Sequence, residues 1–489
     1  MGSVKLIDSA EPFEVSSAFP AEAIPKSRER FEIATAVIER IADVAAVMAA
    51  TTSAYAAYEL LRVGKQLHYS ATSVLLASFG LSVLFVSMLD HDGAYKRANS
   101  LLRIRETERI LRVTMQAFGL VFPVTFFFLH PFSRWVVLLA VVFVPLLVII
   151  EKQFVFVLIR NLHSRGFGLQ NVLIYGAGLT GRRVFSAVVR SPKLGMNPVA
   201  IVDDDEKLVG NEVYEYGYKR ERSASVIAGP LTSDLIRLRS IDLVVIGIPS
   251  ISQQRLKEVA AQAFAAGANV AFVPQLSCSS ETSTDYVDID GVLIASMGLP
   301  ERKRFYELGK QFFDTSAALA LLMFTLPLWA VLTVLIRLDS KGPALFRQMR
   351  VGHRGRTFEL YKFRTMYTEA PKYGFHPKNS DDPRVTRVGR WLRRTSLDEL
   401  PQLINVLKGD MSLVGPRPEM PFIVEHYNAR HWQRLAVIPG LTGLWQLSAD
   451  RAFLIHENIQ YDLYYIRHRN FFMDLAILLH TAVFAMKGI

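Results

Sequence analysis

Four apolar runs of helix length, one after another, constrain this chain of 489 residues more than any other feature. They cover residues 41–61, 71–89, 113–130 and 135–150, and the last run continues through residues 154–159. About 20 apolar residues are enough for a helix to cross a bilayer. Hydrophobic residues make up 51% of the chain and charged residues only 21%, which excludes a simple soluble, collagen-like or disordered protein. We therefore predict a membrane protein in which residues 41–160 form four transmembrane helices.

The basic residues predict how these helices are oriented. Residues 1–40 are polar and charged, so we expect a cytoplasmic N-terminal segment rather than a secretory signal peptide. The loop of residues 90–112 is rich in Lys and Arg, whereas the two loops on the other side carry only Arg62, Lys65 and Arg134. Because Lys-rich and Arg-rich loops stay in the cytoplasm, everything after residue 160 is also expected there.

Two further apolar segments occur near the end of the chain. Residues 312–336 are long enough to cross, but Lys and Arg flank this run on both sides, which conflicts with a crossing. Pro327 would bend a helix here, so we predict a re-entrant helix, with an ordinary crossing as the alternative. Residues 470–489 are apolar but interrupted by charged residues, which favours a helix lying in the membrane interface.

Strands and helices alternate in residues 161–300, which predicts a Rossmann-like, doubly wound α/β domain. Gly176, Gly178 and Gly181 form a GxGxxG motif between a strand and a helix, and Asp203 ends the next strand. This arrangement is typical of dinucleotide binding. The same glycines also serve tight packing of strand against helix, so nucleotide binding and a structural or regulatory role both stay open.

Residues 301–489 carry the residues most suited to catalysis. Asp398 and Glu399 are expected at the start of an apolar helix over residues 397–407, with Ser396 as N-cap and Glu399 completing a capping box. Successive helical residues point about 100° apart, so the two carboxylates suit two different tasks. One, kept ionised by the helix dipole, can attack phosphorus, while the other holds a divalent cation. A purely structural cap is the alternative.

The net charge of +11 is concentrated around this acidic pair. Arg417 lies between Pro416 and Pro418, and such a rigid guanidinium can bind phosphate oxygens through two hydrogen bonds. Arg417 and Arg364 are expected in the site, and Arg393 and Arg394 on the surface. The alternative use of the cations is contact with anionic lipid headgroups. The basic residues considered are Lys362, Arg364, Arg384, Arg387, Arg393, Arg394 and Arg417.

Several adjacent blocks in this region resemble the bacterial sugar transferase family. The blocks are residues 342–352, 361–366, 381–387, 394–419 and 439–446. The resemblance is to the large monotopic phosphoglycosyl transferases, also called polyprenyl-phosphate hexose-1-phosphate transferases, of the undecaprenyl-phosphate glucose or galactose phosphotransferase type. It implies four transmembrane helices, a Rossmann-like domain and a mostly helical catalytic domain with a re-entrant helix.

The resemblance also assigns roles. Asp398 would attack the β-phosphorus of a UDP-sugar, glucose or galactose, releasing UMP, and undecaprenyl phosphate would then accept the hexose 1-phosphate. Glu399 would bind Mg²⁺, Arg417 would hold phosphate, and Lys362 and Arg364 would guide the lipid phosphate. Arg384 and Asp382 fall in the same blocks and are taken as substrate-binding candidates. The product would start exopolysaccharide or O-antigen-type glycan synthesis. The implied setting is the bacterial inner membrane, multi-pass, with a homodimer and no nucleic-acid partner.

Two rival functions stay open. The GxGxxG motif suits a membrane-anchored nucleotide-sugar oxidoreductase or dehydratase, but the only Tyr-x3-Lys pair, Tyr306 and Lys310, lies outside the α/β domain. The second rival is a nucleotide sensor or scaffold without catalysis. The sequence departs from the family at Ala449 and Asp450, where a Gly-Arg is common, so the sugar is less constrained than the reaction.

Overall fold

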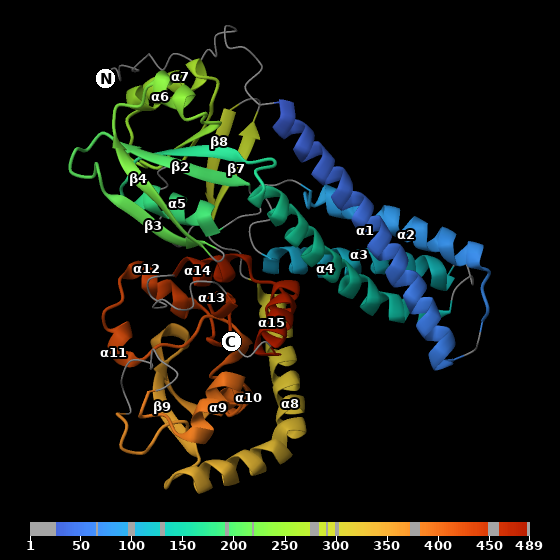
Figure 1. The fold of residues 1–489 in the computed structure, drawn as a ribbon. Coiled ribbons are helices and arrows are strands. Elements are labelled where there is room, and N and C mark those ends of the chain that lie inside the picture. The colour runs from blue at the N-terminus through green and yellow to red at the C-terminus, as the bar shows by residue number, and fades with distance from the viewer. Residues whose placement is uncertain are drawn as a thin grey trace, which may run out of the picture. The chain divides into compact units, whose positions relative to one another are not determined.

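The computed structural model describes residues 26–64, 67–95, 103–127, 133–190, 195–217, 220–273, 283–289, 292–298, 303–371, 382–447 and 459–486. The chain forms two compact units (Figure 1). The first comprises residues 1–101 and 117–276, and the second comprises residues 102–116 and 277–489.

The helical part of the first unit contains the expected apolar runs. Its helices are α1 (Lys26–Leu61), α2 (Ala71–His91), the C-terminal part of α3 (Arg103–Phe127) and α4 (Arg134–Ser164). Helix α1 packs against both α2 and α4. Among the described residues, α2, α4 and the later helix α8 are long and apolar enough to cross a membrane. A crossing by α1 or α3 therefore stays a prediction, and residues 128–130 of the third run lie outside the described residues.

Helix α1 carries a buried charged residue with a partner on another helix. Asp43 of α1 is completely buried, and its Oδ2 accepts hydrogen bonds from Lys152 Nζ of α4 and from the Tyr95 hydroxyl, each at 2.7 Å. A buried carboxylate without a partner is strongly unfavourable, so this pair fixes α1 against α4.

The Asp43–Lys152 pair generates a test of stability. Lys152→Ala leaves Asp43 buried without its ammonium partner, and we expect the free energy of unfolding to fall by about 3–5 kcal/mol. The matched control is Arg40→Ala, which removes the exposed ion pair with Asp90 and should cost about 0–1 kcal/mol. Denaturation of the detergent-solubilised variants measures both. Equal losses would contradict the assigned role of Lys152.

The α/β part of the first unit is built around one six-stranded sheet. The strand order is β3-β4-β2-β1-β5-β6, and all neighbouring pairs are parallel except the antiparallel pair β3 and β4. The strands are β1 (Gln170–Tyr175), β2 (Met196–Asp203), β3 (Glu212–Gly217), β4 (Arg220–Ala228), β5 (Leu243–Ile246) and β6 (Asn269–Phe272). The helices are α5 (Leu179–Arg190), α6 (Ser233–Leu238) and α7 (Gln253–Ala265).

Helices cover both faces of this sheet, as the apolar pattern of β1 requires. Val172 and Ile174 belong to one buried cluster, which includes Phe185 of α5. Leu173 and Tyr175 belong to the other, which includes residues of α6 and α7. Because successive side chains of a strand point to opposite faces, a strand with buried apolar side chains on both faces must be covered twice. The predicted doubly wound domain is present, with the antiparallel pair β3 and β4 at one edge of its sheet.

The second unit is mixed, with short strands among helices. Its strands are β7 (Ser283–Ile289), β8 (Val292–Gly298), β9 (Leu345–Val351), β10 (Thr357–Phe363), β11 (Ser412–Val414) and β12 (Gly440–Thr442). The pairs β7–β8 and β9–β10 are antiparallel, and β11–β12 is parallel. Its helices are α8 (Arg304–Asp339), α9 (Arg387–Thr395), α10 (Gln402–Lys408), α11 (Pro421–Val424), α12 (Ala429–Trp432), α13 (Leu444–Leu447), α14 (Ile459–His468) and α15 (Phe471–Met486). Short 3-10 turns cover His353–Gly355, Leu397–Glu399 and Gln433–Ala436.

Helix α8 is continuous over 36 residues and exposes most of its apolar side chains. Pro327 lies inside it, and Figure 1 shows the α8 ribbon changing direction sharply along its length. Proline is the usual cause of a sharp helix kink, because it removes a hydrogen bond and its ring clashes with the preceding turn. The predicted bend is present, whereas return to the same membrane face stays a proposal.

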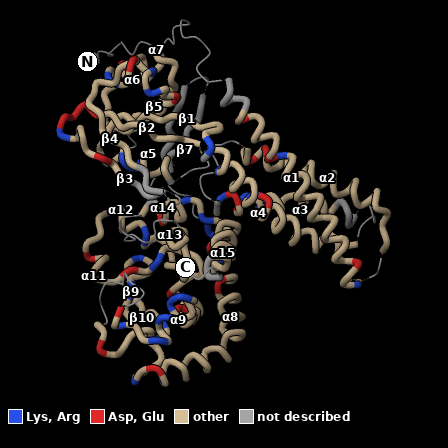
Figure 2. Tube along the Cα trace, viewed as in Figure 1, with Lys and Arg blue, Asp and Glu red and all other residues tan. Residues whose placement is uncertain are grey.

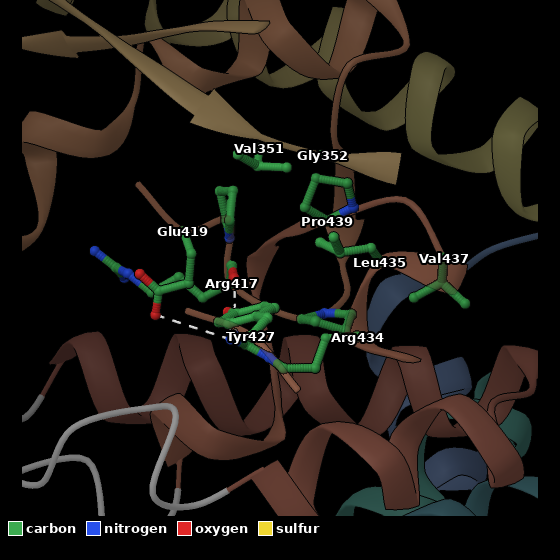
Figure 3. A pocket seen from close by; sticks show the side chains of 11 residues that line it. Val351, Gly352, Arg417, Glu419, Tyr427, Arg434, Leu435, Val437 and Pro439 are labelled. Atoms are coloured by element: carbon green, nitrogen blue, oxygen red, sulfur yellow. Dashed lines mark hydrogen bonds and ion pairs between the residues drawn. The ribbon is translucent and has the colours of Figure 1, made fainter. Parts of the chain in front are cut away.

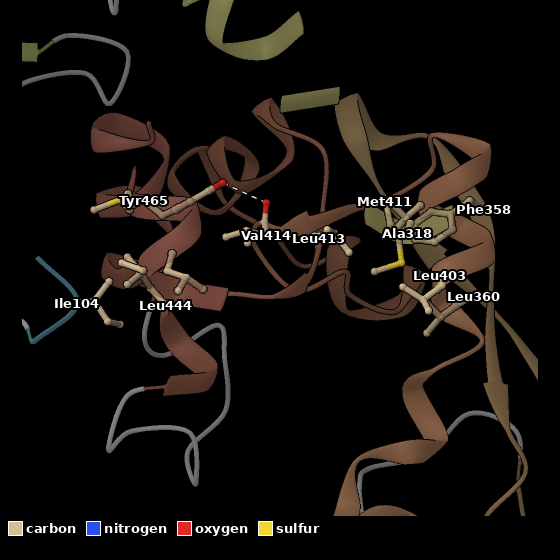
Figure 4. Packing of buried hydrophobic residues seen from close by; sticks show 14 residues of the cluster. Ile104, Ala318, Phe358, Leu360, Leu403, Met411, Leu413, Val414, Leu444 and Tyr465 are labelled. Atoms are coloured by element: carbon tan, nitrogen blue, oxygen red, sulfur yellow. Dashed lines mark hydrogen bonds between the residues drawn. The ribbon is translucent and has the colours of Figure 1, made fainter. Parts of the chain in front are cut away.

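A buried core joins α10 to the strands on either side of it (Figure 4). Leu403 of α10 packs with Leu360 of β10 and Leu413 of β11 in one cluster, which also reaches α15. Near the same core, the Tyr465 hydroxyl of α14 donates to the Val414 carbonyl at 3.0 Å. This packing fixes α10, and hence the turn before it, relative to the segment that follows β11.

Candidate functional site

The acidic pair lies on a tight turn between two helices, and not in the first turn of a helix. Ser396 ends α9 in the left-handed conformation, with φ of 56°, and its side chain makes no capping hydrogen bond. Asp398 and Glu399 follow in a 3-10 turn, and α10 begins only after Pro401. The predicted N-cap and capping box are therefore wrong. The break comes from the left-handed backbone of Ser396, since Leu400, although it precedes Pro401, keeps α-helical φ and ψ of −51° and −38°.

Two cations hold the Glu399 carboxylate. Its Oε1 accepts from Lys362 Nζ of β10 at 2.6 Å and from Arg417 Nη2 at 3.3 Å. Burial by itself would raise the pKa of Glu399, but the charges of Lys362 and Arg417 hold this pKa down to about 2. Glu399 is therefore a fixed anion at neutral pH, with its place set by a strand on one side and the Pro-Arg-Pro segment on the other.

Asp398 is in a different electrostatic state from its neighbour. It is 9% exposed, and no hydrogen bond to its carboxylate is found among the described residues. Burial raises the pKa of Asp398, the negative charge of Glu399 raises it further, and the charges of Lys362, Arg393 and Arg417 oppose this rise. Carboxylates whose pKa values are pushed apart perform different chemical tasks. Asp398, uncommitted to a partner, has the oxygens available for bond formation.

Arg393 was expected on the surface, and this prediction is wrong. Its side chain is half-buried, and its Nε donates to Thr365 Oγ1 at 2.9 Å. Its charge also acts on Asp398. The next residue, Arg394, is exposed as expected. Figure 2 shows Lys and Arg near α9 and β10. The charges of Lys362, Arg393 and Arg417 act on Asp398, in line with the positive field predicted from the sequence.

Arg364 takes a different set of partners from the expected phosphate. Its Nη1 donates to the Lys341 carbonyl at 2.7 Å, and its Nη2 donates to the carbonyl and hydroxyl of Ser340 at 2.7 and 2.9 Å. These groups lie at the C-terminal end of α8, where helix carbonyls lack partners within the helix. The structure therefore gives Arg364 the role of a cap on α8.

Asp382 and Arg384 pair with each other at the edge of the site. Arg384 Nη2 lies 2.7 Å from Asp382 Oδ2, and this hydrogen bonding lowers the pKa of Asp382 to about 2. The pair is close enough to Arg393 for both charges to act on that guanidinium. No hydrogen bond joins either residue to Asp398 or Glu399.

The glycine motif of the first unit is built for close packing. A Cβ on Gly181 would lie 1.7 Å from the Gly176 carbonyl oxygen, and Gly176 has φ of 109°. Gly178 has open space where a Cβ would stand. Asp203 accepts hydrogen bonds from the Ala177 amide at 2.5 Å and the Asp205 amide at 2.9 Å. The glycines and Asp203 thus lie at the ends of β1 and β2, as predicted. The Asp203 carboxylate is hydrogen-bonded to the loops that follow these two strands.

Asp398 and Glu399 supply carboxylate oxygens of the kind that bind a divalent cation. No group of three or more His, Cys, Asp or Glu side chains suited to a metal occurs among the described residues. Mg²⁺ is commonly held by one or two carboxylates together with substrate phosphates and water. Glu399 and Asp398 fit such a shared site, in which the substrate supplies part of the coordination.

Comparison with known proteins places the second unit in a family. Residues 305–488 match the family described as bacterial sugar transferase, and residues 91–274 match one described as a CoA-binding domain. A protein of Bacillus subtilis named uncharacterized sugar transferase EpsL is 40% identical over 182 residues, which cover 37% of this chain and 89% of that protein. The chain belongs to the bacterial sugar transferase family.

Two longer relatives carry more specific names. The galactosyl transferase CpsE of Streptococcus agalactiae is 33% identical, over 59% of this chain and 66% of that protein. The undecaprenyl-phosphate glucose phosphotransferase of Komagataeibacter xylinus is 43% identical, over 36% of this chain and 35% of that protein. The chain thus spans about a third to two thirds of the length of these two family members.

Arg364 binds the end of α8, whereas Arg384 makes a local ion pair, and the stability of variants at the two positions tests this difference. Arg364→Lys loses the planar fork that binds two residues at the end of α8, and we expect the free energy of unfolding to fall by about 2 kcal/mol. The control Arg384→Lys keeps an exposed charge beside Asp382 and should leave the unfolding midpoint nearly unchanged. Thermal denaturation in detergent compares them. An Arg364→Lys variant as stable as the wild type would contradict the capping role and favour Arg364 as a substrate ligand.

Proposed function

We propose that this family member is a phosphoglycosyl transferase that moves hexose 1-phosphate from a UDP-sugar to undecaprenyl phosphate. The observation that supports it most directly is the pairing of an unbonded, buried Asp398 with a Glu399 held by two cations. Such a site joins a nucleophile to groups that stabilise phosphate charge. The names of the Komagataeibacter and Streptococcus relatives support the same reaction class.

The proposed reaction has two displacements at one phosphorus atom. First, an Asp398 oxygen attacks the β-phosphorus of the UDP-sugar, and the bond to the α-phosphate oxygen breaks so that UMP leaves with the electron pair. The sugar phosphate is then bound to Asp398 as an acyl phosphate. An oxygen of undecaprenyl phosphate next attacks the same phosphorus, and the carboxylate leaves. The product is undecaprenyl diphosphate sugar, and Asp398 is restored.

The surrounding residues would stabilise charge during both displacements. Arg417 lies against Glu399, at the position where a guanidinium can bind the phosphate oxygens next to Asp398. Lys362 keeps Glu399 ionised and, with Arg393, favours the ionised form of Asp398. Glu399 would hold Mg²⁺, which when bound neutralises diphosphate charge.

The donor sugar and the membrane arrangement are part of the proposal. Glucose or galactose is favoured, because these sugars occur in the names of the two longer relatives. Residues 449 and 450, where the sequence departs from the family, lie outside the described residues. Helices α1 to α4 would cross the bacterial inner membrane, α8 would enter and return at the cytoplasmic face, and α15 would lie in the interface. A homodimer stays a prediction.

The rival oxidoreductase loses its candidate catalytic pair in the structure. The Tyr306 hydroxyl and Lys310 Nζ both bind Asp474 Oδ2, at 2.6 and 2.9 Å. These contacts connect the start of α8 to α15, and all three residues belong to the second unit. The Tyr-x3-Lys spacing thus serves a structural network, and nucleotide binding by the α/β domain stays a prediction.

The central prediction concerns the nucleophile. Asp398→Asn keeps the shape of the side chain but removes the charge that attacks phosphorus, so UMP release should fall at least about 1,000-fold. Purified protein with polyprenyl phosphate and a panel of UDP-sugars provides the assay, read as UMP formed.

Gly178→Val is the matched comparison for this assay. Gly178 has open space around its missing Cβ, so the variant tests the motif without disturbing the packing of Gly176 and Gly181. We expect UMP release close to wild type. Undiminished release by Asp398→Asn would end the nucleophile assignment, and loss of release in Gly178→Val would show that the α/β domain takes part in the reaction.

The pH dependence of the rate tests the charge on Lys362. The ionised form of Asp398 is the attacking form, and the Lys362 charge lowers the pKa of Asp398. Lys362→Gln removes that charge, so the pKa of Asp398 rises and the acid limb of the kcat/KM profile should move to higher pH. Lys408→Gln, which removes an exposed lysine bonded to the Tyr361 hydroxyl, is the control. A shift to lower pH in Lys362→Gln would contradict the assignment.

A further inference from the structure

The Pro-Arg-Pro segment must hold one guanidinium in a fixed place, yet it has few backbone donors. Pro416 and Pro418 carry no N–H, so this segment cannot be anchored by an ordinary ladder of backbone hydrogen bonds. Its carbonyl oxygens are the groups left for anchoring. The donors to these carbonyls therefore decide how firmly Arg417 is placed.

Four consecutive carbonyls of this segment accept hydrogen bonds, two of them from buried arginine side chains. Backbone amides supply the outer two: Gly440 donates to the Pro416 carbonyl, and Val351 donates to the Glu419 carbonyl, both at 2.9 Å. Side chains supply the inner two. Arg434 Nη2 donates to the Arg417 carbonyl at 3.1 Å, and Arg350 Nη1 donates to the Pro418 carbonyl at 3.4 Å.

Arg434 is itself held by a buried partner. Its side chain is 2% exposed, and its Nε donates to Asp462 Oδ2 of α14 at 2.7 Å, where Asp462 is 3% exposed. Its Nη1 donates to the Tyr427 hydroxyl. The third nitrogen, Nη2, binds the Arg417 carbonyl, so all three nitrogens of this guanidinium have partners. Figure 3 shows Arg434, Tyr427, Arg417 and Glu419 around one pocket.

This arrangement needs the geometry of arginine. A guanidinium presents its donors in a rigid plane, so fixing Nε on Asp462 also fixes the direction in which Nη2 points. A lysine carries one flexible ammonium and cannot bind Asp462, Tyr427 and the Arg417 carbonyl in three fixed directions. A buried ion pair is also weak support for stability compared with apolar packing of the same volume. These features favour a role in placing the Arg417 backbone over a role in stability alone.

We propose that Arg434 and Asp462 are positioning residues for the transfer reaction, holding the Arg417 carbonyl so that the Arg417 guanidinium stays beside Glu399 and Asp398. This inference rests on the proposed function. Neither residue touches the acidic pair, and Arg434 acts only through the backbone of Arg417. Arg350 supports the same segment from β9.

A double-mutant cycle on the full-length protein tests the inference. Arg434→Lys should lower kcat for UMP release about 100-fold with little change in the KM for the UDP-sugar, because a group that acts in the transition state has been displaced. In an Arg417→Ala background, the same change should alter kcat less than about twofold, because residues that act through one another are not additive. Arg347→Lys, at an exposed position on the strand that carries Arg350, is the matched control and should leave kcat unchanged.

Hydrogen–deuterium exchange gives a readout that does not depend on activity. Peptides covering residues 411–424 should exchange faster in Arg434→Lys than in wild type or Arg347→Lys, since the segment has lost one of its four anchors. Asp462→Asn is the second variant in case Arg434→Lys does not fold. Its Oδ1 still accepts the hydrogen bond from Arg434 Nε, so we expect the same changes in kcat and exchange at smaller size.

The outcomes separate the two claims. Equal loss of kcat from Arg434→Lys in both backgrounds would show a general structural effect and would overturn the positioning role. Unchanged exchange in residues 411–424 would also overturn it. If the wild type releases no UMP from any UDP-sugar, the proposed function fails, while the exchange comparison still shows whether Arg434 holds the segment.

Discussion

The site depends on one shared carboxylate oxygen. Glu399 Oε1 is bonded to Lys362 and Arg417, which come from opposite sides of the acidic turn, one from a strand and one from a proline-flanked loop. This contact brings three separate stretches of the chain together, and beside them the Asp398 carboxylate has no hydrogen bond within the part of the chain that the structure describes. A charge-assisted hydrogen bond with little access to water is stronger than one on the surface, so a single anion is enough to organise the cations.

The fold around this contact places rigid elements behind each participant. Lys362 stands on β10, which packs on α10, and the acidic turn leads directly into α10. Arg417 follows β11, and the Tyr465 hydroxyl of α14 binds the last carbonyl of that strand. Reactive groups supported in this way keep their geometry, whereas groups on free loops would have to be ordered when substrate binds. The core of the second unit therefore serves the site as well as stability.

Much of this organisation was predictable from the sequence, because it follows from local patterns. The apolar runs predicted the long helices, the alternation of strands and helices predicted the doubly wound sheet, and the density of cations predicted the field around Asp398 and Glu399. The errors concern single residues. Ser396 ends one helix and does not cap the next, and Arg393 is half-buried because it meets Thr365, 28 residues away in the sequence. Arg364 binds the end of α8, and its expected contact with phosphate stays a prediction. Nothing in the local sequence identifies Arg434 as a neighbour of Arg417, since residues 17 apart meet only through tertiary packing.

The network at the start of α8 has a mechanical consequence. Lys310 binds Asp474 of α15, and Asp314, one turn further along α8, accepts a hydrogen bond at 2.6 Å from the Ser412 hydroxyl at the beginning of β11. That strand runs within a few residues into the Pro-Arg-Pro segment. The buried Asp314 carboxylate therefore connects α8 directly to the strand that leads to Arg417, so a displacement of α8 along its axis would reach the acidic pair through a single side chain.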